Sequence, residues 1–286
     1  MEEQIDLTPF DNFKISGFQP LQDLKRSPCP KCKASRMYFC YTCYKYVEDI
    51  DQSKLPKIKL PIPVDIIKHQ KELDGKSTAI HAALIAPDDV HIYIYPVIPD
   101  YSKQQDVLLV FPGPGAHSLE YYSKPKSDSA TILHTRKRVI TDTGDGPQAK
   151  EIHIDKDTIT ENHAHDEKTE NEKKTMGSQN GVNFEPTFKK VVLIDSTWNQ
   201  VHGISSDKRL KGVKCVELTE QSTNYWRRQH SRPDNHLATI EAIHSFCKQY
   251  HEKFIGEYSG QYDNLLYFFK FFYKMVHKNK ELKKRF

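Results

Sequence analysis

The amino-acid sequence predicts an α/β protein with a mostly parallel sheet, and three observations lead to this prediction. Residues 107–111 and 191–194 are apolar throughout, which is typical of parallel strands that helices cover on both faces. Residues 91–98 alternate isoleucine and tyrosine, as a strand does. Residues 237–254 and 262–277 carry apolar residues at helical spacing, so they supply helices that can cover the sheet.

The strands follow one another with clear punctuation. A short apolar stretch at 78–85 precedes the alternating strand, and the strand at 107–111 stops at Pro112-Gly113-Pro114-Gly115, a run of turn residues. After a long polar segment, the strand at 191–194 ends at Asp195. A weaker apolar run at 215–218 predicts one further strand.

The C-terminal part supplies the helices. Apolar residues recur every three or four positions from Leu237 to Phe254, which makes one stripe on a helix of about five turns. Residues 262–277 are apolar nearly all round, and the aromatic rings among them suit a core helix better than base stacking. Residues 278–286 form a basic tail that contacts phosphate or is simply solvated.

The composition points to a segment that does not fold. Only 37% of the 286 residues are hydrophobic, and residues 124–180 mix charged residues with Ser, Thr, Asn and His without any period. We expect this segment to be a disordered insert. Its His163-Ala164-His165 and Arg136-Lys137-Arg138 runs are interpreted as solvated linker, with a metal site and a localisation signal as alternatives. Residues 51–123 and 181–277 then form one α/β domain.

The charge and the apolar runs limit the possible partners. The net charge of +4 is compatible with binding to nucleic acid but does not by itself indicate it. No run approaches the roughly 18 apolar residues of a membrane helix, and the N-terminus lacks a basic flank and an apolar stretch. Neither a membrane span nor a signal peptide is expected, and nothing in the sequence indicates a protein partner.

Four of the six cysteines form a candidate zinc site in residues 26–50, after an N-terminal extension at 1–25. They make two C-x2-C pairs, Cys29 with Cys32 and Cys40 with Cys43, a spacing that presents four thiolates from two tight turns. Four sulfur ligands leave no open position on zinc, so this zinc knuckle is predicted to be structural. A redox pair and thiols without metal are the alternatives; two disulfides fit poorly in a reducing compartment.

The loop after the strand at 191–194 is the main candidate for function. Ligands bind beyond the carboxyl ends of strands in open α/β sheets, and here the residues are Asp195, Ser196, Thr197, Trp198, Asn199 and Gln200. They bring a carboxylate, two hydroxyls, an indole and two amides to one exit loop. A helix cap formed by Asp195 or Ser196 explains the same residues, so both interpretations stay open at this point.

The run Asp195-Ser196-Thr197-Trp198 after an apolar strand resembles the D-x-T-W signature of the DTW-domain family. The two cysteine pairs are similar to the N-terminal cysteine module of that family. Two further similar segments are His69-Gln70-Lys71-Glu72 followed by Lys76-Ser77-Thr78, and the helix start Leu237-Ala238-Thr239-Ile240-Glu241-Ala242. The resemblance covers almost the whole chain except the insert. Ala238 stands where the family usually has serine, so any role of that hydroxyl is absent.

The resemblance implies a SPOUT-like α/β fold with a knotted C-terminal half that binds S-adenosylmethionine. It implies the activity of a tRNA-uridine aminocarboxypropyltransferase. The 3-amino-3-carboxypropyl group would move from S-adenosylmethionine to N3 of a uridine in the tRNA D-loop, with methylthioadenosine as the second product. Nuclear localisation is also implied, and the basic run at 136–138 agrees with it.

On this interpretation, Asp195, Thr197 and Trp198 form the catalytic group. Asp195 is the base, or the acceptor that orients the N3–H bond, and Trp198 stacks on adenine or uracil unless it belongs to the core. The residues expected at the cofactor are Pro112, Gly113, Thr239 and Glu241. The residues expected to bind RNA are Arg227, Arg228 and Arg232, and the basic residues of the cysteine module form a second candidate surface.

Two other functions fit the same sequence. A SPOUT-type RNA methyltransferase would share the fold and the co-substrate, since only the bound pose selects the carbon that is attacked. A zinc-containing RNA-binding protein without catalysis would use Asp195 only as a helix cap.

Overall fold

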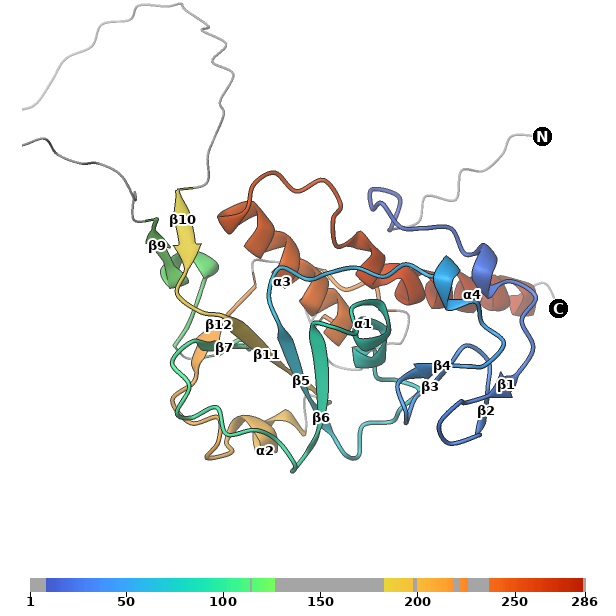
Figure 1. Ribbon diagram of the computed structural model, residues 1–286, viewed down its shortest axis with the longest axis horizontal. Helices are drawn as coiled ribbons and strands as arrows, with labels where there is room; N and C mark the ends of the chain where they lie inside the picture. The colour runs from blue at the N-terminus through green and yellow to red at the C-terminus, as the bar shows by residue number, and fades with distance from the viewer. Residues whose placement is uncertain are drawn as a thin grey trace, which may run out of the picture. The chain divides into compact units, whose positions relative to one another are not determined.

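The computed structural model describes residues 9–113, 115–126, 183–197, 200–218, 222–225 and 237–284. Six of the described strands form one sheet in the order β6-β5-β11-β7-β12-β8, and every neighbouring pair is parallel (Figure 1). These strands are β5 (Val64–His69), β6 (Val90–Tyr95), β7 (Val107–Val110), β8 (Ala116–His117), β11 (Lys190–Asp195) and β12 (Lys214–Val216). The prediction of a parallel α/β sheet is therefore confirmed.

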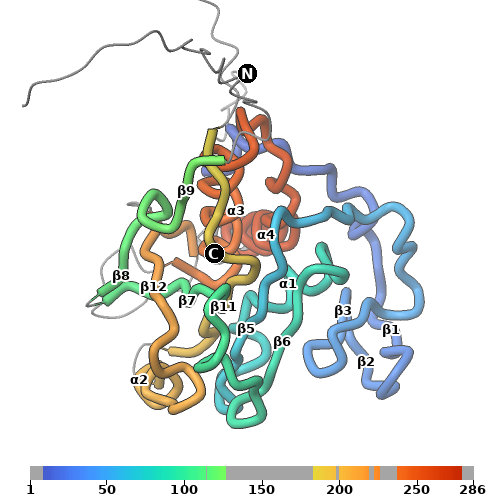
Figure 2. The backbone as a smooth tube through the Cα atoms, turned by 60° about the vertical axis from the view of Figure 1, so that its left-hand side comes forward, coloured from blue at the N-terminus to red at the C-terminus, as the bar shows by residue number. Residues whose placement is uncertain are grey.

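Helices cover the sheet on both faces. Alternate residues of β11 show this, because Val191 and Leu193 pack in the large core cluster while Val192 packs in a separate one. The large cluster joins the sheet to α1 (Ala79–Ile85), α3 (Thr239–Phe254) and the start of α4 (Tyr267–Lys284), and the separate cluster includes Ile204 of α2 (Val201–Ser205). Figure 2 shows α3 and α4 on one side of the strands and α2 on the other. Burial on both faces explains the uninterrupted apolar runs.

Most predicted elements are found close to their expected positions. β7 and β11 match the apolar runs, and α3 ends at Phe254 as its stripe predicts. The second helix begins later than expected, because a 3₁₀ turn at Asp263–Leu266 precedes α4, and α4 then continues to Lys284, into the residues expected to form a basic tail. β6 ends at Tyr95 and lies at one edge of the sheet.

One central strand, β5, has no counterpart among the predicted elements. It lies between β6 and β11, and its apolar run is interrupted by Asp65 and Lys68. Both charges are buried with partners: Asp65 accepts from the Tyr101 hydroxyl at 2.9 Å and from Lys190 at 3.0 Å, and Lys68 donates to Asp74. Because these charged residues interrupt the apolar run, a search for apolar stretches in the sequence does not detect this buried strand.

The remaining short strands form three antiparallel pairs. The cysteine region contains β1 (Ser27–Pro28) with β2 (Ser35–Arg36) and β3 (Phe39–Cys40) with β4 (Lys45–Tyr46). β9 (Ser123–Pro125) pairs with β10 (Phe184–Pro186), so the first residues of the expected insert lie in a strand. From residue 127 onwards the insert lies outside the described residues. The 3₁₀ turns not yet mentioned are Gln19–Leu21, Gln52–Lys54 and Leu119–Tyr122.

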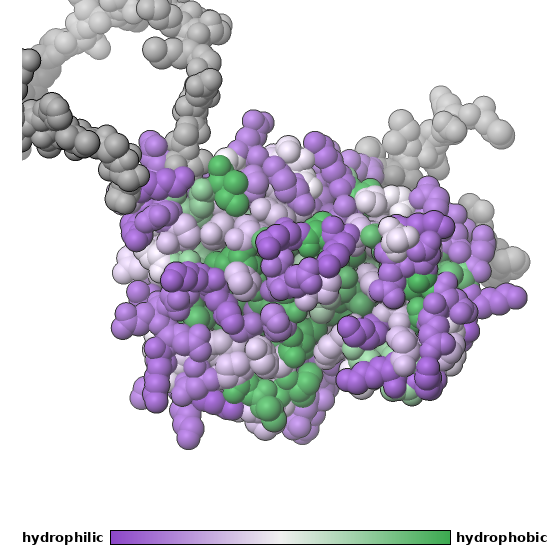
Figure 3. All heavy atoms as spheres, viewed as in Figure 1, coloured by the Kyte–Doolittle hydropathy of each residue, from purple (hydrophilic) through white to green (hydrophobic). Residues whose placement is uncertain are grey.

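The surface in the view of Figure 3 is largely hydrophilic, with an apolar patch below the carboxyl end of β6. Two exposed side chains at that end are Ile94 and Val97. No helix within the described ranges is long and apolar enough to cross a membrane.

Candidate active site and cysteine cluster

The carboxyl ends of β5 and β11 define the candidate active site. The two strands are adjacent and parallel, with Asp195 opposite Lys68, so the segments that follow them leave the sheet at the same edge. One segment contains Thr197, and the other is the turn 70–78 that leads into α1. In an open parallel sheet this is the edge where ligands bind.

Asp195 is at the centre of this edge and is only 4% exposed. Its Oδ2 accepts a hydrogen bond from the Ser77 hydroxyl at 2.7 Å, and its Oδ1 accepts one from the Thr239 hydroxyl at 2.5 Å. Burial raises the pKa of Asp195, although the two hydroxyls and the positive charge of Lys68 favour the carboxylate. Both oxygens of this carboxylate are therefore already occupied by protein donors.

Three segments that are far apart in the sequence meet at this carboxylate. Asp195 ends β11, Ser77 precedes α1, and Thr239 begins α3. A further bond, from the Ile240 backbone N–H to the Thr78 hydroxyl at 3.2 Å, joins the starts of the two helices. The segments that resemble the DTW-domain motifs are thus brought together at one point of the fold.

Glu72 is a second carboxylate at the same edge. It lies in the turn after β5 and is partly buried, and its Oε2 is shielded from solvent without a hydrogen-bond partner in the described part of the chain. Burial raises the pKa of Glu72 and the negative charge of Asp195 adds to this, whereas Lys68, Lys76 and the Thr197 backbone N–H lower it. Two neighbouring carboxylates in different environments can perform different tasks.

The sequence pattern does not single out Lys68 or Asp74, which complete this polar edge. Lys68 is 5% exposed and forms an ion pair with Asp74, so its positive charge stays beside Asp195. Both residues belong to β5 or to the turn after it. A prediction of β5 as a strand would place Lys68 and Asp74 at the carboxyl edge of the sheet.

Glu241, predicted to contact the cofactor, anchors the chain before α3. Its carboxylate accepts from the Thr223 hydroxyl at 2.6 Å and from the backbone N–H groups of Asn224 at 2.6 Å and Ala238 at 2.8 Å. Burial raises the pKa of Glu241, although these donors favour its charged form. The bond to Ala238 is one half of a capping box at the N-terminus of α3; the other half needs a side-chain acceptor that alanine lacks.

The missing half of the capping box leads to a stability prediction. Ala238→Ser adds a hydroxyl that can accept from the backbone N–H at position 241, so we expect the free energy of unfolding to rise by about 1 kcal/mol. Urea denaturation would measure the change. Ala238→Val, which adds bulk without an acceptor, is the control and should not stabilise the chain.

The loop after β7 reaches the same edge of the sheet, since Val110 is in register with Leu193 of β11. Pro112 and Gly113 are exposed, and a side chain at Gly113 would meet only the Phe111 ring, at 3.9 Å. This backbone is open to a ligand, and its contact with a cofactor stays a prediction.

Four predicted site residues lie outside the described residues. They are Trp198, Arg227, Arg228 and Arg232. Ser196 and Thr197 are described: the Thr197 carbonyl accepts from the Ser196 hydroxyl at 3.2 Å and from the Gln200 N–H at 2.9 Å, where the chain turns into α2.

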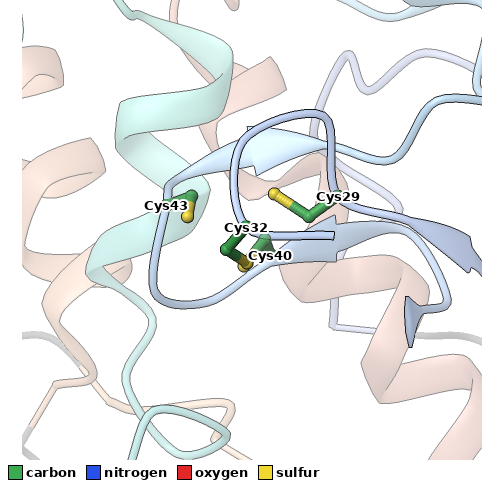
Figure 4. Close-up of side chains that lie close together, drawn as sticks. All are labelled: Cys29, Cys32, Cys40 and Cys43. Atoms are coloured by element: carbon green, nitrogen blue, oxygen red, sulfur yellow. The ribbon is translucent and has the colours of Figure 1, made fainter. Parts of the chain in front are cut away.

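The cysteine cluster is built from two similar turns. The N–H groups of Lys33 and Tyr44 each donate at 2.9 Å to the carbonyl of the first cysteine of their pair, Cys29 and Cys40. Lys33 and Tyr44 both have left-handed φ values, 58° and 53°, so each turn folds back tightly. The four sulfur atoms, which come from both turns, lie within 4.8 Å of one another (Figure 4).

The sulfur positions fit a tetrahedral zinc ion. At a Zn–S distance of about 2.3 Å, tetrahedral ligands lie about 3.8 Å apart, and the Cys32 and Cys40 sulfurs are 3.6 Å apart. Burial disfavours the Cys40 thiolate, but the N–H groups of Cys43 and Thr42 outweigh it and lower the pKa to about 6. Burial and the neighbouring thiols raise the pKa of Cys43 to about 12. They disfavour the Cys43 thiolate, and a bound cation would offset this effect.

The cysteine region is packed against the helices of the main sheet. Phe39 contacts Phe268 of α4 edge to face at 5.1 Å, and the Tyr46 hydroxyl donates to the carbonyl of Leu84 in α1 at 3.2 Å. Tyr44 directly follows Cys43. Burial raises the pKa of Tyr44 to about 12, and the negative charges of Asp74 and Asp195 at the candidate site add to the shift. The cluster therefore supports α1, the helix that follows Ser77.

Comparisons with known proteins agree with this arrangement. A family model described as the DTW domain matches residues 37–277. Three similar curated proteins carry the name tRNA-uridine aminocarboxypropyltransferase 1. The one from Xenopus laevis is 42% identical over 90% of this chain and 82% of the relative. The one from Rattus norvegicus is 42% identical over 89% of this chain and 78% of the relative. The one from Homo sapiens is 40% identical over 94% of this chain and 84% of the relative. No solved structure matches the chain. The chain belongs to the DTW domain family.

Proposed function

We propose that this protein is an S-adenosylmethionine-dependent tRNA-uridine aminocarboxypropyltransferase. The observation that carries the proposal is the meeting of three motif segments at Asp195, on the edge of a parallel sheet where ligands bind. The named activity of relatives about 40% identical over most of their length supports the same reaction.

The proposed reaction needs two contributions from the protein. Uridine N3 attacks a sulfonium carbon, which is already activated by its leaving group, so the protein must align the two atoms and remove the N3 proton. Alignment and a positioned base contribute most of such a rate increase, with about 10²- to 10⁴-fold from the base. This proposal includes N3 as the uridine atom that is alkylated and the D-loop of the tRNA as the place of that uridine.

Asp195 fits the alignment role. Both of its oxygens accept hydrogen bonds from hydroxyls, and it is almost completely buried. It holds the start of α3 and the turn before α1 against β11, and in this way it fixes the edge on which S-adenosylmethionine and the uridine must be placed. Because a carboxylate oxygen can accept a second bond, orientation of the N3–H bond by Asp195 is compatible with this role.

The cysteine cluster is proposed to hold one structural zinc ion through Cys29, Cys32, Cys40 and Cys43. The ion would fix the two turns and leave no coordination position for substrate. Its role in the reaction is indirect, through the contacts of this region with α1 and α4.

Binding of tRNA is proposed to involve phosphate contacts and exposure of a single-stranded loop base. Arg227, Arg228 and Arg232 stay the predicted contacts from the main domain. In the cysteine region, Lys33 pairs with Glu48 at 2.7 Å, which reduces the contribution of this lysine to a positive surface. A SPOUT-like knotted fold and nuclear localisation also stay predictions; the parallel order of the sheet supports the former.

Analysis of the products tests the proposed function. The purified protein is incubated with unmodified tRNA and with S-adenosylmethionine labelled in the carboxypropyl group. We expect the label on a uridine of the tRNA and release of methylthioadenosine. Release of S-adenosylhomocysteine would instead identify a methyltransferase, and no product with properly folded protein would indicate an RNA-binding role.

A further inference from the structure

Proton removal from uridine needs a base, and the groups of the Asp195 cluster are already engaged by protein partners. Asp195 already receives two hydroxyl hydrogen bonds, and Lys68 is held in an ion pair with Asp74. The ring of His69 is also engaged, since its Nδ1 accepts from the Lys71 backbone N–H at 3.1 Å.

We propose that Glu72 accepts the N3 proton of the target uridine. Its side chain lies at the same edge as Asp195, with Oε2 shielded from water and without a hydrogen-bond partner among the described residues. Buried polar atoms normally have a partner, so an orphan acceptor beside a candidate site is suited to a donor that arrives with the substrate. This inference rests on the proposed function.

The charges around Glu72 suit a base. Burial disfavours the carboxylate, and so does Asp195 from β11. Lys68 from β5, Lys76 from the same turn and the Thr197 backbone N–H after β11 stabilise it. The net effect raises the pKa of Glu72 above the ordinary value for glutamate. A carboxylate with a raised pKa binds a proton more strongly, as a general base must.

The step balances in atoms and charge. The N3–H bond breaks and its proton moves to the Glu72 carboxylate, while the N3 electron pair forms the new bond to the carbon of the aminocarboxypropyl group. The bond between that carbon and sulfur breaks, and its electron pair stays on sulfur. An anionic glutamate, a neutral uridine and a sulfonium become a glutamic acid, an alkylated uridine and the neutral thioether of methylthioadenosine.

Glu72→Gln tests the assignment, because glutamine keeps the size and the acceptor oxygen but cannot take the proton. We expect kcat to fall about 10²- to 10⁴-fold, with KM for tRNA and for S-adenosylmethionine little changed. In the wild type, kcat should rise with pH through a limb above the ordinary pKa of glutamate, and the variant should lack that limb. Glu252→Gln, which neutralises an exposed glutamate on α3, is the control and should keep wild-type kcat.

A modified substrate separates proton transfer from a structural effect. Fluorine at C5 of uridine acidifies N3, so tRNA transcribed with 5-fluorouridine needs less help from a base. With this tRNA, the kcat of Glu72→Gln should rise at least about tenfold above its value with ordinary tRNA, a gain within the contribution expected of a base. The kcat of Asp195→Asn should rise little. Near-wild-type kcat in Glu72→Gln, or a loss that the fluorinated tRNA does not relieve, would overturn the role of Glu72. Absence of product from the wild-type protein would instead refute the proposed function itself.

Discussion

Cys40→Ser is expected to abolish zinc binding and to destabilise the whole protein by about 4 kcal/mol or more, the size of effect that loss of a metal produces. Cys40 is fully buried, and the residue before it, Phe39, packs on Phe268 of α4. Loss of the ion would therefore loosen a surface that the main domain uses as part of its core. For a domain of this size, the melting temperature should fall by about 8–16 °C.

Zinc content and thermal unfolding measure this prediction together. Wild-type protein should contain one zinc ion per chain, and a chelator should lower its melting temperature to a value near that of the variant. The control is Cys215→Ser, because Cys215 is a partly buried thiol on β12, away from the cluster; this variant should keep its zinc. Full zinc content in Cys40→Ser, or a chelator without effect on the wild type, would contradict a structural zinc site.

The parallel sheet was predictable because its interior strands have a simple composition. Val191 and Leu193 face one cluster and Val192 the other, so β11 is apolar at every position but its ends. β5 is the exception, since it contains the charged residues Asp65 and Lys68. Asp65 is paired with Lys190 and Lys68 with Asp74, and the proximity of these partners depends on the fold. A buried charge such as Asp65, whose partner Lys190 is 125 residues away in the sequence, cannot be recognised from local periodicity.

The candidate active-site edge was predictable in part. The loop at Asp195 follows from the position of a strand end, and the segments with Ser77 and Thr239 were recognised by resemblance. Their hydrogen bonds to the two oxygens of one carboxylate come from packing across 118 and 44 residues of sequence, which no spacing rule contains. The orphan oxygen of Glu72 is likewise a property of the folded surroundings alone.

Asp195→Asn is expected to lower the transfer rate by at least about 10²-fold, because small displacements of an aligned site are that costly. One amide oxygen replaces two carboxylate oxygens, so the hydroxyl groups of Ser77 and Thr239 compete for it and the start of α3 shifts relative to β11. The measurement is transfer of the labelled group per folded molecule. Asp65→Asn is a suitable control: it alters a buried aspartate of the neighbouring strand away from the edge, so it should cost stability while folded molecules keep their activity.

The same variant should change the pH dependence of stability in a defined direction. Burial raises the pKa of Asp195 in the folded protein, so the folded chain holds this proton more tightly than the unfolded chain does. The protonated Asp195 carboxyl therefore contributes to the free energy of unfolding. This contribution is complete below the pKa of the unfolded chain, about 4, and it is lost as the pH rises through the raised pKa of the folded chain. Asparagine cannot ionise, so the unfolding free energy of Asp195→Asn should improve relative to wild type as the pH rises over that interval. Urea denaturation from pH 4 to pH 8 measures the difference. A difference that stays constant over this range would mean that burial of the Asp195 charge is fully compensated by Ser77, Thr239 and Lys68, and that the folded edge holds an ordinary carboxylate.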